Sequence, residues 1–126
     1  MKVLIRVKGE NDIKPIVKVF EYQRQDEGIF FSSIEIIKNK VSKNQKLNIN
    51  ETLALFAAFV VTSINEDMPV KEIRKNICHL VLPNQVLIGV PELLSKLTFI
   101  VTTEHISEKE LAIEAPIPLQ SFKLAN

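Results

Sequence analysis

The feature that most constrains the fold is an apolar helical run near the middle of the chain. Leu53 to Val61 is apolar at every position, and the preceding Asn48 is a favoured helix N-cap. Glu51 stands where a capping-box glutamate reaches back to the backbone. A helix that is apolar on every side must be buried on every side, in a core or in an interface. We therefore expect Phe56 and Phe59 to be buried, and part of this helix to face another subunit.

Composition limits the class of protein. The chain has 126 residues, of which 46% are hydrophobic, so residues 1–126 are predicted to be a single domain with one core. A net charge of +1 favours neither a nucleic-acid nor a membrane partner. No apolar run reaches the roughly eighteen residues of a membrane-spanning helix. The apolar run at the N-terminus is too short for a secretory signal. Together with the single cysteine, Cys78, these features predict a cytoplasmic protein.

The N-terminal segment has the alternating pattern of β-strands. Met1–Lys8 alternates apolar and basic residues, 9–12 has turn chemistry, and Ile16–Tyr22 is rich in β-branched and aromatic residues. A strand pair alone is barely stable in water. Its apolar face must therefore be covered by the core, by a partner subunit or by a second copy of the chain.

Further helices and a second strand pair follow. Helical periodicity predicts helices over 28–43, from Asn48, from Pro69, and a short one from Pro83 that Gly89 ends. Two alternating segments, 97–102 and 111–115, predict a C-terminal antiparallel β-hairpin. The predicted fold class is α+β, with an N-terminal strand pair, three to four packed helices and this closing hairpin.

Few residues in the sequence suggest chemistry. Cys78 and His79 are adjacent, so on a helix they point about 100° apart and are poorly placed to hold one metal ion. His105 falls in a predicted turn, and Ser32 and Ser33 have no base that the sequence identifies. We predict no catalytic, cofactor-binding or metal-binding residue in this chain.

Two clusters of charge are interpreted as solvated surface. The acidic one comprises Glu104, Glu108, Glu110 and Glu114, and the basic one comprises Lys38, Lys40, Lys43 and Lys46. The basic cluster has no interleaved aromatic residues to stack on bases, and the protein is nearly neutral, which argues against a nucleic-acid site.

A series of short motifs, in order and at constant spacing, resembles the gamma subunit of microbial urease. The motifs are Lys46-Leu47-Asn48 with Glu51, Ala54-Leu55 and Ala58-Phe59 in the apolar helix, Gln85-Val86, Gly89-Val90-Pro91-Glu92, and Leu111 through Ile117. The resemblance divides the chain into an extension (1–20), a urease-gamma-like region (21–117) and a tail (118–126).

The resemblance implies a role in assembly. In this family the gamma subunit packs with alpha and beta subunits, and three such units assemble further. The alpha subunit carries both nickel ions and the catalytic groups, so this chain would hold no cofactor and would be inactive alone. It would be a non-catalytic structural subunit of a complex that hydrolyses urea. Two alternatives remain: a gamma-like scaffold or regulatory module of another assembly, and a small enzyme or ligand-binding protein.

The sequence also departs from the family pattern. The family's glycine before Lys46 is replaced by Asn44-Gln45, and its Gly-Ala-Arg after the apolar helix becomes Ser63-Ile64-Asn65. Its later Glu-Gly-Arg becomes Asn76-Ile77-Cys78. Arginines available for contacts between subunits are therefore missing. Residues 1–20 are added at the front, and their removal is predicted to leave the helical part folded but to weaken assembly or expose apolar surface.

Overall fold

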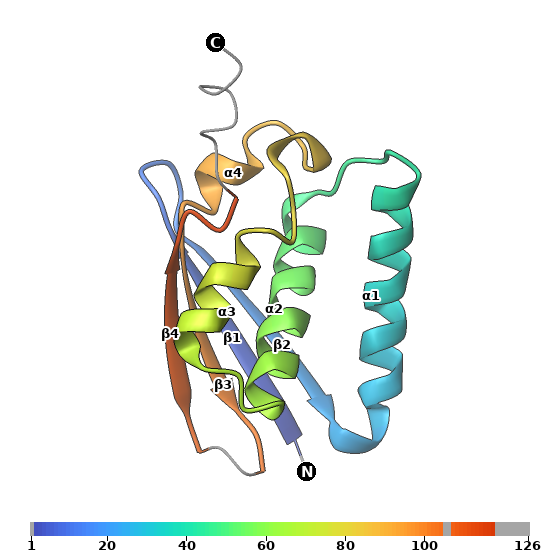
Figure 1. Cartoon of the computed structure of the whole chain (residues 1–126), viewed down its shortest axis with the longest axis vertical. Coiled ribbons are helices and arrows are strands. Elements are labelled where there is room, and N and C mark those ends of the chain that lie inside the picture. The colour runs from blue at the N-terminus through green and yellow to red at the C-terminus, as the bar shows by residue number, and fades with distance from the viewer. Residues whose placement is uncertain (1, 105–106, 118–126) are drawn as a thin grey trace.

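The two strand pairs join into one antiparallel sheet, and the helices cover one face of it (Figure 1). The computed structural model describes residues 2–104 and 107–117. Its elements are β1 (Lys2–Glu10), β2 (Ile16–Gln23), α1 (Glu27–Ser42), α2 (Ile49–Asn65), α3 (Val70–Ile77), α4 (Val90–Leu93), β3 (Lys96–Thr102) and β4 (Lys109–Glu114). Single 3-10 turns span Arg24–Asp26 and Pro83–Gln85. The predicted α+β class, with both strand pairs and the helices between them, is confirmed.

The extension supplies a central strand of the sheet. The strand order is β2-β1-β3-β4, so β1 pairs with β2 on one side and with β3 on the other. Alternation places Val3, Ile5 and Val7 on the helix-facing side, where each is at most 1% exposed. The sequence left open whether the core, a partner subunit or a second copy would cover this apolar face. In the structure, the core of the same chain covers it.

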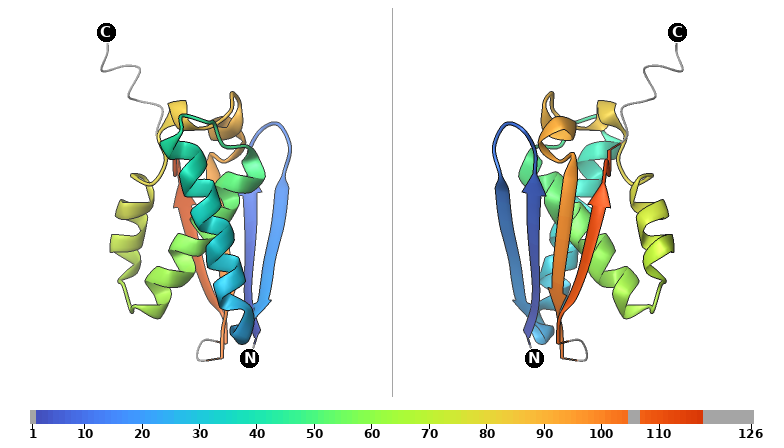
Figure 2. Two further views of the ribbon diagram at one scale, coloured as in Figure 1. Left: turned by 90° about the vertical axis from the view of Figure 1, so that its right-hand side faces the viewer. Right: turned by 90° about the vertical axis from the view of Figure 1, so that its left-hand side faces the viewer.

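Helix α2 lies at the centre of the helical layer, between the sheet and the other helices (Figure 2). Ten of its seventeen residues are buried, and Phe56, Ala57, Val60 and Val61 are fully so. The sequence expectation of a helix buried nearly all round is confirmed for Phe56. Phe59 is only partly buried, so the expectation for this residue is wrong within the single chain.

The start of α2 carries the predicted capping box. Asn48 Oδ1 accepts a hydrogen bond from the Glu51 N–H at 2.8 Å, and the Asn48 N–H donates to Glu51 Oε1 at 3.0 Å. Lys40 Nζ, from α1, lies 2.7 Å from Glu51 Oε2. Burial alone would raise the pKa of Glu51, but the hydrogen bonds from Lys40 and Asn48 outweigh it, and the pKa of this carboxyl lies below its usual value. The cap therefore also ties α1 to α2.

Two motifs that are far apart in the sequence meet beside this cap. The Leu47 N–H donates to the Gln85 carbonyl and the Leu87 N–H to the Leu47 carbonyl, each at 2.9 Å. Leu47 and Val86 form a parallel bridge, and both are buried. Asn44, three residues before Leu47, has a φ of +60°, a left-handed conformation that asparagine tolerates better than most residues.

The predicted fourth helix is wrong in its bounds. Pro83 starts only a single 3-10 turn, because the backbone is extended at Val86, where it pairs with Leu47. Gly89 does not end a helix but precedes α4, with a φ of +94° that favours glycine.

Within the described residues, no helix is long and apolar enough to cross a membrane.

The turn of the N-terminal hairpin is fixed to the rest of the chain. Asn11 Oδ1 accepts hydrogen bonds from the N–H groups of Ile13 and Lys14, at 2.7 and 2.6 Å. Asn11 Nδ2 donates to the Leu93 carbonyl at the end of α4, at 2.8 Å. The extension is thus bonded to the family-like region at its turn as well as along β1.

The central position of β1 reverses the predicted effect of removing the extension. A chain that begins at residue 21 is expected to lose cooperative unfolding, because the edge of β3 and the core beneath β1 lose their cover. Ile5→Ala, a milder change, is expected to cost about 2–5 kcal/mol in the free energy of unfolding. Lys8→Ala, exposed on the same strand, should change it by less than about 0.5 kcal/mol. Urea denaturation followed by circular dichroism measures all three, and a truncated chain with an unchanged transition would contradict this account.

Candidate functional site: an apolar groove between two helices

The residues singled out for chemistry do not converge. Cys78 ends α3, and its thiol lies 3.4 Å from the Arg74 carbonyl; burial raises the pKa of this thiol. His79 follows in an exposed turn, and Ser33 is exposed on α1 with its hydroxyl donating to the Ile29 carbonyl. Ser32 is also exposed, and His105 lies outside the described residues. No nucleophile and base come together among the described members of this set.

The charged clusters lie on the surface. Glu108, Glu110 and Glu114 are exposed on the C-terminal strand pair, and Glu104 lies 3.8 Å from Arg24. Across residues 2–104 and 107–117, no group of three or more histidine, cysteine or acidic side chains is placed to hold a metal ion. In the basic cluster, Lys40 is engaged with Glu51 and Lys38 lies 3.5 Å from Glu35.

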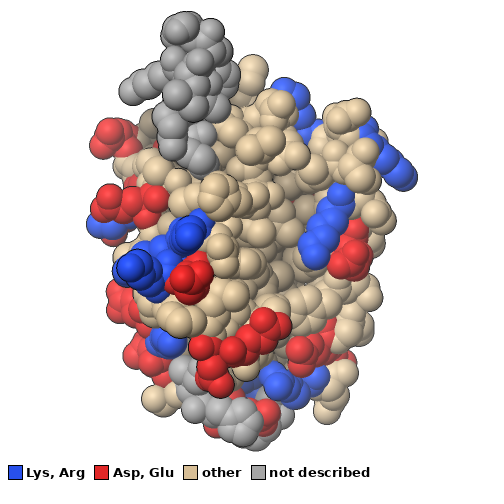
Figure 3. Space-filling model, in the orientation of Figure 1, with Lys and Arg blue, Asp and Glu red and all other residues tan. Residues whose placement is uncertain are grey.

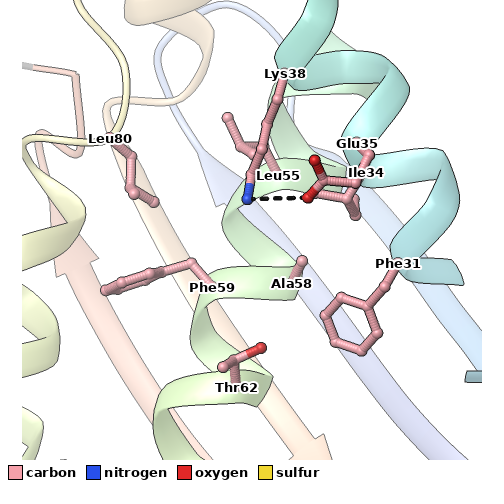
Figure 4. A pocket seen from close by; sticks show the side chains of 9 residues that line it. All are labelled: Phe31, Ile34, Glu35, Lys38, Leu55, Ala58, Phe59, Thr62 and Leu80. Atoms are coloured by element: carbon pink, nitrogen blue, oxygen red, sulfur yellow. Dashed lines mark hydrogen bonds and ion pairs between the residues drawn. The ribbon is translucent and has the colours of Figure 1, made fainter. Parts of the chain in front are cut away.

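The strongest candidate site is an apolar groove between α1 and α2 (Figure 4). It encloses about 180 Å³. Its lining residues are Phe31, Ile34, Glu35, Lys38, Leu55, Ala58, Phe59, Thr62 and Leu80. Ile34, Leu55 and Ala58 are buried, whereas Phe31, Phe59 and Leu80 remain partly exposed. The groove therefore has a buried apolar floor and half-buried apolar walls.

Charges stand only at the margin of this groove. The Glu35 and Lys38 ion pair lies on its α1 side (Figure 4). In the space-filling view, a largely uncharged area extends over α2 between α1 and α3 (Figure 3). An apolar centre with a charged rim is the usual composition of a protein contact surface. Outside the groove, Ile29 and Ile36 of α1 are also exposed, at 71% and 65%.

The sequence contained part of the signal for this groove. An all-apolar α2 indicated that one side would face something beyond a small core, and the structure identifies that side by Phe59. Leu80 follows the same helical spacing as Ile73 and Ile77 in the sequence, but it lies beyond the end of α3 and reaches the groove through the chain turn after it, which periodicity does not predict.

Fold and groove together define a small α+β protein whose candidate functional surface has the composition of a protein contact surface. The family model described as "Urease, gamma subunit" matches residues 20–117 of the 126, and the chain belongs to the urease gamma subunit family. A curated relative, "Urease subunit gamma" of Halalkalibacterium halodurans, is 30% identical over 67 residues, which make up 53% of this chain and 67% of that protein. All of β1 precedes the family match.

The groove predicts different roles for the two phenylalanines of α2. Phe56→Ala should lower the free energy of unfolding by about 3–5 kcal/mol, because it opens a cavity in a closed core. Phe59→Ala should cost clearly less, because the Phe59 side chain is already partly in solvent. Urea titrations of the two variants provide the comparison. Equal losses would show that Phe59 is part of the core and that the groove wall is not available to a partner.

Proposed function

We propose that this chain is a non-catalytic structural subunit of a nickel-dependent urease, in which an alpha subunit hydrolyses urea to ammonia and carbamate. The observation that carries the proposal is that all nine groove residues lie inside the segment that matches the urease gamma family. A surface for assembly is thus built entirely from the part of the chain that the family shares.

The proposed partners are the alpha and beta subunits, with three such units in the complete assembly. A stable interface of standard size buries about 800 Å² on each partner, far more than the groove alone. In this proposal the groove is the anchor: an apolar side chain of the partner enters between Phe31 and Phe59 and reaches the floor at Ala58.

The proposal assigns nickel and the catalytic groups to the alpha subunit, and it assigns the complex to the cytoplasm. This chain contributes shape and apolar surface rather than ligands. An oligomeric enzyme gains stability from each interface that binds only the folded state. The chain would therefore stabilise the assembly around the catalytic subunit.

A second candidate, a gamma-like scaffold or regulatory module of another assembly, is favoured by one observation. Residues 1–19 precede the family match and add a central strand to the sheet. A sheet rebuilt in this way presents surfaces that the matched segment alone does not provide.

Co-expression with urease alpha and beta chains tests the proposal. We expect a complex of all three subunits by native mass spectrometry, with nickel and urea hydrolysis in the complex and neither in the isolated chain. Phe59→Asp should abolish co-purification, because it places a carboxylate in the apolar groove. Ile13→Asp is the matched control: this residue is 72% exposed and precedes the family match, so the complex should form unchanged.

Two outcomes would count against the proposal. Stoichiometric nickel binding by the isolated chain would place the metal here rather than in the alpha subunit. A folded chain that co-purifies with neither urease partner would favour the scaffold or regulatory role instead.

A further inference from the structure

No helix among the described residues covers the face of the sheet opposite the helical layer (Figure 2, right). Apolar side chains on it are unusually accessible: Val17 is 65% exposed and Val19 47%, both on β2. Leu4 and Ile100 are partly exposed on β1 and β3. Because β1 and half of β2 precede the family match, the residues before the match build somewhat less than half of this outer face.

Charge is divided across the outer face. The β2–β1 half carries Lys2, Arg6 and Lys8 against Glu10 and Glu21, a net charge of +1 (3 − 2). The β3–β4 half carries Lys96 against Glu110 and Glu114, a net charge of −1 (1 − 2). The cross-strand register places Arg6 and Glu110 on either side of Ile100. In the described part of the chain, neither Arg6 nor Glu110 is within ion-pairing distance of an opposite charge, whereas Lys2 pairs with Glu21 at 3.1 Å and Lys96 with Glu10 at 3.7 Å.

We propose that this outer face binds a second copy of the chain, in a two-fold dimer whose axis runs parallel to the strands between β1 and β3. Such an axis lays the β2–β1 half of one copy over the β3–β4 half of the other. The basic half of each copy then faces the acidic half of its partner. A two-fold interface has to be self-complementary in this way.

The side chains along the strands agree with this axis. Stacked sheets lie about 10 Å apart, a distance that a long arginine and a glutamate can bridge. Arg6 lies over Ile100 of the second copy, with its guanidinium next to Glu110 there. Val17 lies over the Ala112 of the second copy, and Glu10 over its Lys96. Val17 thus meets a small residue, and Arg6 and Glu10 meet opposite charges, whereas Val19 lies over Glu110 of the second copy.

The area of the face sets the strength of the dimer. Four strands about 4.8 Å apart, paired over about seven residues of about 3.3 Å each, cover roughly 19 by 23 Å. This is smaller than the roughly 800 Å² per partner of a standard interface. The dimer is therefore expected to be weak and concentration-dependent. It leaves the groove between α1 and α2 free, since the groove lies in the helical layer on the other side of the sheet.

Sedimentation velocity of the full chain, from about 1 to 500 µM, tests this dimer. The unaltered chain should shift from monomer to dimer within this range. Arg6→Glu and Glu110→Arg, each alone, should weaken association by about tenfold or more, because each puts like charges together. Glu72→Arg is the control: Glu72 is exposed on α3, away from this face, and the change should leave association unaltered.

A mixture separates contacts between chains from contacts within one chain. Arg6→Glu chains mixed with Glu110→Arg chains should form a heterodimer of near-original affinity, because both inter-chain pairs then join opposite charges. The double variant should also regain association. Circular dichroism checks that every variant is folded.

Three results would overturn the inference. These are a chain that stays monomeric at every concentration, a dimer that is indifferent to both charge reversals, and restoration in the double variant but not in the mixture. Because these measurements need no urease subunit, they stand apart from any failure of the proposed assembly.

Discussion

The burial of α2 on nearly every side is the constraint on which the rest of the structure depends. A helix without a polar face needs apolar cover from several directions. The sheet provides it on one side, through Ile5 and Phe99, and α1 and α3 provide it on others, through Ile34 and Ile73, all at most 3% exposed. The cover is incomplete at the groove, where Phe59 stays partly exposed. The same helix thus determines both the core and the candidate contact surface.

The extension packs against the core and is an integral part of the fold. β1 fills the edge of β3 and places three fully or almost fully buried side chains under the helices. The Asn11 side chain then bonds the hairpin turn to the end of α4. The segment that matches the family is therefore combined with β1 and the first half of β2, which precede the match. The groove lies in the segment that matches the family, whereas the outer face of the sheet is built partly by β1 and the first half of β2, which precede the match.

Local features of the fold could be predicted from the sequence, because they depend on neighbouring residues. The capping box of Asn48 and Glu51 needs only a spacing of three, and each strand pair is recognised by its alternation. The joining of the two pairs into one sheet could not be predicted, because β1 contacts β3 across most of the chain. The position of Gly89 relative to a helix could not be predicted either, because a glycine with positive φ occurs at both ends of helices. The bridge between Leu47 and Val86 keeps the chain extended before Gly89, so Gly89 precedes α4.

Hydrogen exchange measured by mass spectrometry tests the central claim most directly, by comparing the chain alone with the chain in a complex with urease alpha and beta subunits. Alone, α2 should exchange most slowly, because its backbone opens only when the core opens. In the complex, added protection should appear in α1 around Phe31–Lys38 and after the end of α3 around Leu80, the walls of the groove. Protection confined to other surfaces, with these segments unchanged, would contradict the assignment of the groove as the contact surface.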